Sequence, residues 1–528
     1  MTPDLARIPR WTLALVAGLA AALAHPPFGV LPGLLGYALL LWLVDTADAE
    51  KPLRSAFWRG WLAGVAYFAI GTWWVAEAFL VDIVHHGWMA PFAVAFMAGG
   101  VALFWGAVAL VYRRIAPAGL SRVLVFAGVL SACEWLRGHV LTGFPWNLPG
   151  ETWRAGSAMS QTAALVGAYG LTWITLATVC TAVLWREGRR GRLAIGAAVA
   201  VLAGLFTWGA VRTLDPTSAS GPAVRVRIVQ ADIKQAAKYD PDHFRRIVDA
   251  YVALTRRPGA DGARPADIVI WPEGAIPAAA NDYLAPDTWT RAAIEEALSP
   301  GQTLLVGAYR YEGPPDRPLY FNSLVAARRT AGGLEPVGVY DKHRLVPFGE
   351  YLPLDGLMTR LGIKTLVHVG DGFQTGPAPR SLRPPGLPAF QPLICWEAVY
   401  PGFTRAGARA SGLAPAFIVN VSNDAWFGST SGPLQHLNIA SYRAIEEGVP
   451  MLRSTPTGVS AVIDAVGQVR GASLGLGQAG VIDATLPPRR PETPFRRFGD
   501  MSFLALLLIS GLYSLRPPIA ARLKSLRD

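Results

Sequence analysis

The chain has 528 residues, of which 52% are hydrophobic, and a formal net charge of +11. It is too long for one ordinary domain and too apolar for an ordinary soluble protein, so we expect a part that spans a membrane. The excess of positive charge lies largely beside apolar segments, which argues against a nucleic-acid partner and favours contact with anionic membrane lipid.

Apolar windows of roughly 17 to 22 residues, about the length of a bilayer-crossing helix, divide the chain. Between residues 212 and 500 no such window occurs, and strand-sized apolar runs alternate there with amphipathic stretches. We therefore predict a polytopic α-helical membrane domain with about eight spans, joined to one aqueous α/β domain. The windows, the fifth and last of them short, are 11–27, 28–46, 61–80, 91–112, 123–138, 165–185, 193–211 and 501–515.

Segments rich in proline, serine and charge set the predicted boundaries, because such segments rarely form core elements. The predicted parts are a membrane domain with seven spans (1–211), a linker (212–222), the aqueous domain (223–486), a second linker (487–500), a C-terminal span (501–515) and a tail (516–528).

Positive charge in the short connections predicts the orientation, because such residues stay in the cytoplasm. One set of connections holds nearly all of them, whereas the alternate set holds only Arg137 and Arg154. Both termini are therefore expected in the cytoplasm and the aqueous domain on the far, periplasmic face. The rich set comprises Arg7, Arg10, Lys51, Arg54, Arg59, Arg113, Arg114, Arg122, Arg186, Arg189, Arg190, Arg192, Arg516, Arg522, Lys524 and Arg527.

One cysteine of the three lies in the aqueous domain, at the end of the apolar run "AFQPLIC". Cys133 and Cys180 fall inside predicted spans, so Cys395 has no partner for a disulfide within its domain. Two interpretations remain open, a small buried hydrophobic residue or a reactive thiol. The position at the end of a strand, where open parallel sheets place their chemistry, favours the reactive thiol.

Two other ionisable residues also follow apolar runs. Glu273 ends "ADIVIWPE", and Lys342 follows the run 336–340. A thiol with a pKa of about 8.5 needs a base before it can attack a carbonyl, and a desolvated Glu273 could be that base. Lys342 and the backbone N–H of Trp396 could stabilise the oxyanion. Each residue alone also has an ordinary structural explanation.

Together, "IWPEG", "YDKHRLVPFGE" and "LICWE" resemble the Glu–Lys–Cys triad of the nitrilase, or carbon–nitrogen hydrolase, superfamily. With the helical N-terminal half, "TGFPWN" (142–147) and one C-terminal span, the whole chain resembles the apolipoprotein N-acyltransferase family. The resemblance implies an αββα sandwich at the outer face of a bacterial inner membrane.

The implied reaction is acyl transfer in two steps. Cys395 takes an acyl chain from a phospholipid as a thioester, and the α-amino group of a diacylglyceryl-modified lipoprotein cysteine then accepts it. Glu273 serves as the base and Lys342 holds the oxyanion. A membrane-tethered amidase that uses water as acceptor is the alternative, and a transporter with a periplasmic binding domain is a third, non-enzymatic hypothesis.

The resemblance also implies supporting residues. Glu350, eight residues past the lysine, could orient Lys342 or the incoming amine, and Asn322 matches a position near the acyl site. Trp396 stands where many family members have tyrosine, and Glu397 follows it. Asn423 and Trp426 could line the acyl entrance or belong to the core.

The remaining predictions concern the membrane and cofactors. The apolar segment 351–370 could be an arm that dips into the interface, or an ordinary core helix. Glu134 and Arg137 are expected to form a structural ion pair on one helix face. The histidines show no paired-ligand spacing and no Gly-rich phosphate loop is present, so we predict neither metal nor cofactor.

Overall fold

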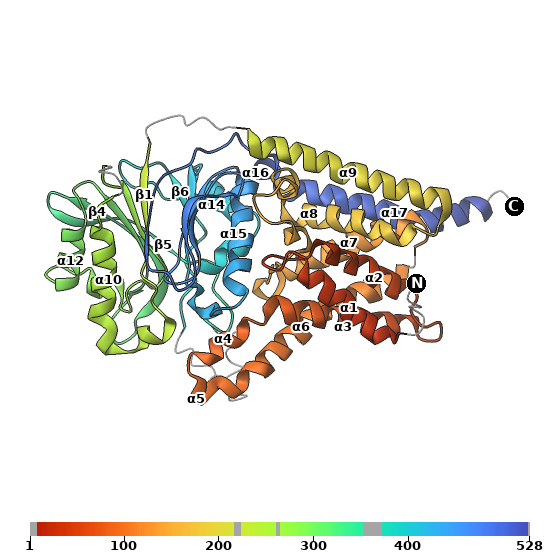
Figure 1. Ribbon diagram of the computed structural model, residues 1–528, viewed down its shortest axis with the longest axis horizontal. Coiled ribbons are helices and arrows are strands. Elements are labelled where there is room, and N and C mark those ends of the chain that lie inside the picture. Colours follow the sequence, from red (N-terminus) through yellow and green to blue (C-terminus); the bar gives the residue numbers. More distant parts are fainter. Residues whose placement is uncertain (1–7, 116, 216–222, 260–263, 352–371, 526–528) are drawn as a thin grey trace. The chain divides into compact units, whose positions relative to one another are not determined.

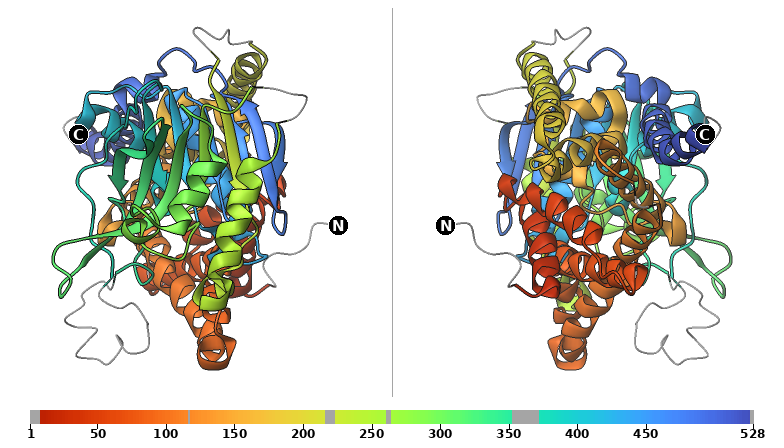
Figure 2. Two further views of the ribbon diagram at one scale, coloured as in Figure 1. Left: turned by 90° about the vertical axis from the view of Figure 1, so that its left-hand side faces the viewer. Right: turned by 90° about the vertical axis from the view of Figure 1, so that its right-hand side faces the viewer.

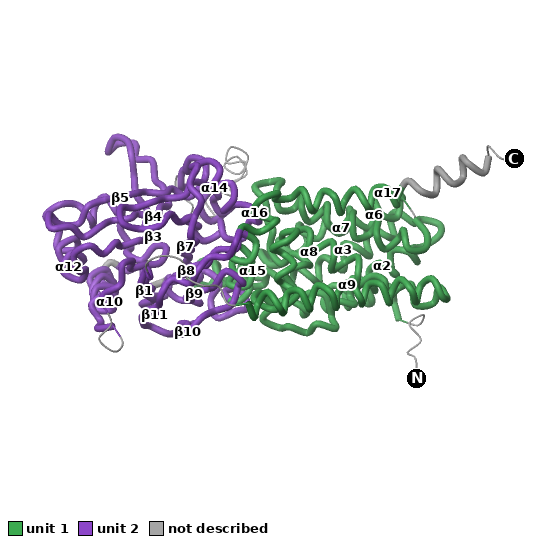
Figure 3. Tube along the Cα trace, turned by 90° about the horizontal axis from the view of Figure 1, so that it is seen from above, with its two compact units in different colours: residues 1–215, 434–446, 492–528 green, residues 216–433, 447–491 purple. Residues whose placement is uncertain are grey.

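The computed structural model describes residues 8–115, 117–215, 223–259, 264–351 and 372–525, which fall into two compact units (Figures 1 and 3). The first unit comprises residues 1–215, 434–446 and 492–528, and the second comprises 216–433 and 447–491. The predicted interfacial arm, apart from its first residue, lies outside the described residues.

The first unit is helical, and every apolar window predicted from the sequence overlaps a helix in it. Its longer helices are α1 (Arg10–Leu23), α2 (Leu35–Asp45), α3 (Pro52–Thr72), α6 (Ala90–Ile115), α7 (Leu120–Arg137), α8 (Ala163–Val179), α9 (Gly188–Leu214), α15 (Gly432–Glu447) and α17 (Met501–Ser525). Its short helices are α4 (Val75–Leu80), α5 (Ile83–His86) and α16 (Pro494–Phe498).

By length and composition, three helical stretches within the described ranges could cross a membrane: Ile83–Ile115, Met159–Leu184 and Gly188–Leu214. Arg10–Leu23, Leu31–Asp45 and Met501–Ser514 are apolar but shorter. The helical membrane domain is confirmed as a class, whereas the number of eight spans stays a prediction.

Small residues and a buried ion pair on α7 help to hold the helices of this unit together. A Cβ at Gly18 would lie 1.9 Å from the carbonyl oxygen of Ala63, so only glycine lets α1 approach α3 this closely. The predicted pair on α7 is present and buried, with Arg137 Nε donating to Glu134 Oε2 at 2.8 Å. Trp105 Nε1 of α6 donates to Glu134 Oε1 at 2.8 Å, which satisfies the second oxygen. The ion pair is therefore a structural tie between helices.

The second unit contains two sheets. The six-stranded sheet has the order β11-β1-β2-β3-β4-β5, and the five-stranded sheet the order β10-β9-β8-β7-β6. Strands β1, β2 and β3 are mutually parallel, as are β6, β7 and β8. The strands are β1 (Arg225–Gln230), β2 (Ile268–Trp271), β3 (Thr303–Glu312), β4 (Leu319–Thr330), β5 (Gly333–Asp341), β6 (Phe390–Ile394), β7 (Phe417–Val421), β8 (Met451–Ser454), β9 (Ser460–Ile463), β10 (Val469–Leu474) and β11 (Gly480–Thr485).

This unit has two hydrophobic cores. Residues such as Ile270, Leu305, Phe390 and Val419 form the core between the two sheets. Helices α10 (Phe244–Arg256) and α12 (Trp289–Ala297) contribute Tyr251 and other residues to a second core on the outer face of the six-stranded sheet. In the left view of Figure 2, α10, drawn in yellow-green, lies in front of these strands.

Helix α14 (Phe403–Ser411) packs on the five-stranded sheet, where Gly407 lies against the side chain of Gln391. The predicted αββα sandwich is confirmed. Its buried parallel strands end at one edge, which is where such sheets carry their sites.

Candidate active site

The three residues predicted to carry the chemistry each follow a strand of the second unit. Lys342 follows β5 directly, Cys395 follows β6 directly, and Glu273 comes two residues after β2. Asn322 lies on β4, and its backbone oxygen accepts a hydrogen bond from the Lys342 N–H at 2.8 Å. Strand β4 therefore fixes the backbone at Lys342.

A charged network surrounds Lys342, which is 1% exposed. Its Nζ lies 2.9 Å from Glu350 Oε1 and 3.5 Å from Glu273 Oε1. Asn322 Nδ2 donates to the same two oxygens, at 2.7 Å each. Burial opposes the charged form of Lys342, but Glu350, Glu273 and Cys395 raise its pKa overall. The lysine is thus a permanent ammonium that both carboxylates share.

One oxygen of Glu273 remains available. Its Oε2 is buried and has no hydrogen-bond partner among the described residues, whereas Oε1 is occupied by Asn322 and Lys342. A buried carboxylate oxygen without a donor is costly unless a substrate or a catalytic proton occupies it. Glu273 is therefore arranged to accept a proton.

Close backbone contact fixes Glu273. A Cβ on Gly307 of β3 would lie 2.5 Å from the Cα of Glu273 and 2.8 Å from the carbonyl oxygen of Pro272. Only glycine permits this approach, so β3 supports the turn that carries the base.

Cys395 stands on a strained turn. Its φ of +48° lies in the left-handed region, where a residue with a side chain costs about 1–3 kcal/mol. The residue begins the short 3₁₀ helix η12 (Cys395–Val399). A side chain on such a sharp strand-to-helix turn stands clear of the sheet, as the nucleophile of α/β-hydrolases does.

The thiol of Cys395 is buried and uncharged at rest. Burial and the charge of Glu273 raise its pKa to about 12, although Lys342, the Ser422 side chain and the backbone N–H of Asn423 act in the opposite direction. The Glu273 and Lys342 charges thus both act on the sulfur. Because so little thiolate exists at neutral pH, the attack depends on transfer of the thiol proton to a base.

Glu397 connects the nucleophile turn to the lysine turn. Its Oε2 accepts the N–H of Ile394 at 2.9 Å, and its Oε1 accepts the Tyr340 hydroxyl at 2.8 Å and the N–H of His343 at 2.7 Å. Burial raises its pKa to about 7, against the pull of these hydrogen bonds. Glu397 is therefore a positioning residue that holds Lys342 and Cys395 in register.

The other predicted site residues lie close by. Trp396 is buried and its Nε1 donates to the Tyr400 hydroxyl at 2.9 Å, so its side chain braces the turn. Asn423 follows β7, and its Nδ2 donates to Gln235 Oε1 at 3.0 Å, while its Oδ1 is buried without a partner among the described residues. Trp426 is half-buried in a short 3₁₀ helix, Asp424–Phe427.

Sequence reasoning missed a second lysine at the site. Lys238 belongs to the short 3₁₀ helix Gln235–Tyr239, and its Nζ is buried with no hydrogen-bond partner among the described residues. This nitrogen would lie 3.4 Å from a Cβ built on Gly274, directly beside Glu273. Burial lowers its pKa to about 8, although Glu273 opposes the shift. Nothing in the local pattern of the sequence distinguishes Lys238 from a surface lysine.

Comparisons with known proteins cover both units. Residues 17–181 match the family described as Apolipoprotein N-acyltransferase N-terminal domain, and residues 225–492 match Carbon-nitrogen hydrolase. A protein of Caulobacter vibrioides named Apolipoprotein N-acyltransferase is 64% identical over 505 residues, which are 96% of this chain and 94% of that protein. The chain belongs to the apolipoprotein N-acyltransferase family.

More distant members of the N-acyltransferase family match over a similar length. The proteins of that name from Rhodopseudomonas palustris and Bradyrhizobium diazoefficiens are each 37% identical to this chain. The first covers 96% of this chain and the second 97%. An amidase from Nesterenkonia sp. of known structure is 18% identical, covers 52% of this chain and 93% of its own, and has a TM-score of 0.34. The family assignment does not depend on that amidase.

The first prediction concerns the positioning carboxylate of this N-acyltransferase. In the wild type, both Glu397 oxygens accept hydrogen bonds. In Glu397→Gln, an amide N–H₂ group replaces one of these oxygens and faces a donor, so the unfolding free energy should fall by about 1–3 kcal/mol. The rate of Cys395 acylation should fall about tenfold or more, because the turn loses its tie to His343. Thermal unfolding and single-turnover acylation measure the two effects. An acylation rate equal to wild type would show that Glu397 does not position the nucleophile.

The second prediction concerns pH. Because the pKa of Cys395 is raised to about 12, its thiolate fraction should grow about tenfold per pH unit between pH 7 and 9. Alkylation of Cys395 in the wild-type protein by a small haloacetamide, followed on the peptide by mass spectrometry, should rise with the same slope. A plateau below pH 8 would mean that the resting cysteine is already a thiolate.

Proposed function

We propose that this enzyme transfers a fatty acyl chain from a phospholipid to the α-amino group of a diacylglyceryl-modified N-terminal cysteine on a lipoprotein. The observation that carries the proposal is the buried, protonated Cys395 on its strained turn, next to Glu273 with a free oxygen and the ammonium of Lys342. The family match favours this reaction over others that the same triad supports.

The first half-reaction forms a thioester. Glu273 Oε2 takes the thiol proton as Sγ attacks the ester carbonyl of the phospholipid, and the tetrahedral oxyanion lies against Lys342 and the N–H of Trp396. Collapse breaks the ester C–O bond, and protonated Glu273 returns its proton to the leaving alkoxide. The products are acyl-Cys395 and a lysophospholipid.

The second half-reaction forms an amide. The neutral α-amine of the lipoprotein attacks the thioester carbonyl, and Glu273 takes one amine proton while Lys342 again faces the oxyanion. Collapse breaks the C–S bond, and the sulfur leaves as a thiol that receives the proton from Glu273. No nucleotide or metal is required, because the thioester is already an activated acyl group.

Hydrolysis by water is the alternative outcome at the same triad. Purified full-length enzyme, given defined phospholipid and a synthetic diacylated lipopeptide, should convert the lipopeptide to its N-acylated form with little free fatty acid. Cys395→Ala should form neither product. Free fatty acid released at the same rate with and without lipopeptide would contradict acyl transfer and favour the amidase hypothesis.

We further propose a location and topology. The chain is a membrane enzyme of the bacterial inner membrane, with about eight spans, both termini in the cytoplasm and the second unit in the periplasm. The charge distribution between alternate connections supports this orientation, and a cysteine-accessibility tag at residue 490 should react from the periplasm. Labelling only from the cytoplasmic side would overturn the orientation.

A further inference from the structure

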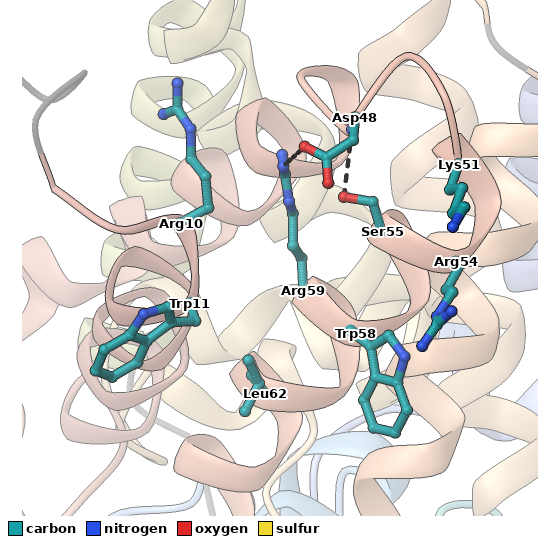
Figure 4. A pocket seen from close by; sticks show the side chains of 9 residues that line it. All are labelled: Arg10, Trp11, Asp48, Lys51, Arg54, Ser55, Trp58, Arg59 and Leu62. Atoms are coloured by element: carbon teal, nitrogen blue, oxygen red, sulfur yellow. Dashed lines mark hydrogen bonds and ion pairs between the residues drawn. The ribbon is translucent and has the colours of Figure 1, made fainter.

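A pocket of about 380 Å³ lies in the first unit, between the start of α1 and the first half of α3 (Figure 4). Its charged lining consists of Arg10, Lys51, Arg54 and Arg59 against a single carboxylate, Asp48. The lining therefore carries a net positive charge. None of these residues takes part in the reaction proposed above.

The carboxylate serves a structural purpose. Asp48 Oδ1 accepts a hydrogen bond from Arg59 Nη2 at 2.9 Å, and Arg59 Nη1 donates to the carbonyl oxygens of Leu43 and Thr46 at 2.8 and 2.7 Å. Arg59 is only 6% exposed, so it ties the end of α2 to α3. Asp48 is therefore already neutralised by a cation that belongs to the framework.

The other three cations are not used in this way. Within the described ranges no ion pair is formed by Arg10, Lys51 or Arg54. The guanidinium of Arg10 lies over the ring of Trp42, 4.6 Å from its centroid, and in Figure 4 it points away from Lys51 and Arg54. Lys51 and Arg54 therefore provide the donors for the oxygens of an anion.

The lining changes from charged to apolar along α3. Lys51 and Arg54 are followed by Trp58 and then Leu62, over a rise of about 16 Å along the helix. Trp58 is 48% exposed, and Trp11 on α1, which is 58% exposed, lies on the other side of the opening in Figure 4. Exposed tryptophans of this kind prefer the interface between headgroups and hydrocarbon. A free phosphate would use the cations but would leave this apolar side unoccupied.

We propose that this pocket binds an anionic phospholipid, with the headgroup phosphate at Lys51 and Arg54 and an acyl chain along Trp58 and Leu62. Under the proposed orientation the pocket opens to the cytoplasmic leaflet, whereas the acyl donor is used on the opposite side. The bound lipid is thus a second lipid, not the substrate. Its binding does not depend on acyl transfer at Cys395.

Native mass spectrometry of the full-length protein in detergent tests the proposal with phosphatidylglycerol and phosphatidylcholine as probes. Wild type should bind phosphatidylglycerol preferentially, and Lys51→Ala/Arg54→Ala should weaken that binding about tenfold or more, because each cation near an anionic headgroup contributes about 1 kcal/mol. Both residues are exposed, so the fold should survive their removal.

Arg189→Ala/Arg190→Ala is the matched control, since it removes the same charge from exposed positions at the start of α9. It should change binding less than about twofold. Trp58→Ala should weaken binding of phosphatidylglycerol but leave that of glycerol 3-phosphate unchanged. The proposal would be overturned if both lipids bound equally well, or if the two double variants lost binding to the same extent. It would also be overturned if glycerol 3-phosphate displaced bound phosphatidylglycerol as effectively as a competing lipid does.

Discussion

Glu273→Gln should slow the formation of acyl-Cys395 by about 100- to 10,000-fold, the range that positioned general bases contribute. The effect is expected to be large because the resting thiol, with its pKa raised to about 12, is almost fully protonated at neutral pH. The amide has the shape of the carboxylate, and its oxygen can still accept from Asn322, which donates to Glu273 Oε1 at 2.7 Å. The chemistry should therefore fail while the fold survives.

The control for this variant is Glu296→Gln, which makes the same change on the exposed side of α12, where Glu296 pairs with Arg256. Single-turnover acylation by a defined phospholipid should be unchanged in the control. Retention of more than a tenth of the wild-type rate by Glu273→Gln would show that another group deprotonates Cys395.

Lys342→Met should lower acyl transfer at least about 100-fold, a loss comparable with removal of an oxyanion donor. It should also destabilise the protein, because Glu273 and Glu350 would then face each other without the ammonium that lies 3.5 and 2.9 Å from them. Breaking one partner of a buried charge network typically costs about 3–5 kcal/mol. Both transfer rate and thermal unfolding should therefore fall.

A double variant separates the two effects. In Lys342→Met/Glu350→Gln the unpaired charge is reduced, so thermal stability should recover in part, while the transfer rate should stay low. If activity recovered together with stability, Lys342 would be a structural residue only, and its proposed contact with the oxyanion would be wrong.

The strand ends could be predicted from the sequence because each has a local signal. Apolar runs followed by Pro-Glu-Gly, by Asp-Lys-His and by Cys-Trp-Glu placed Glu273, Lys342 and Cys395 at the ends of three strands, where parallel sheets collect their chemistry. The ion pair of Glu134 and Arg137 could also be predicted from a local signal, because residues three apart are neighbours on one face of a helix.

Other features depend on contacts between distant segments. Glu397 acts through the backbone at His343, a separation of 54 residues that no local pattern encodes. Lys238 becomes part of the site only because its short helix lies beside Gly274. The left-handed φ of Cys395 is likewise imposed by the surrounding turn and not by the preference of cysteine. Charged residues inside helices such as α3 and α7 also obscure the number of spans, which hydropathy alone does not decide.

The acyl-enzyme itself tests the central claim most directly. Intact-protein mass spectrometry of the wild-type enzyme, incubated with one defined phospholipid and no acceptor, should show one added acyl chain on Cys395. The adduct should be released by neutral hydroxylamine, as thioesters are, and should transfer to a diacylated lipopeptide with a free α-amine but not to its N-acetylated form. No adduct on the wild type, or an equal adduct on Cys395→Ala, would contradict the proposed mechanism.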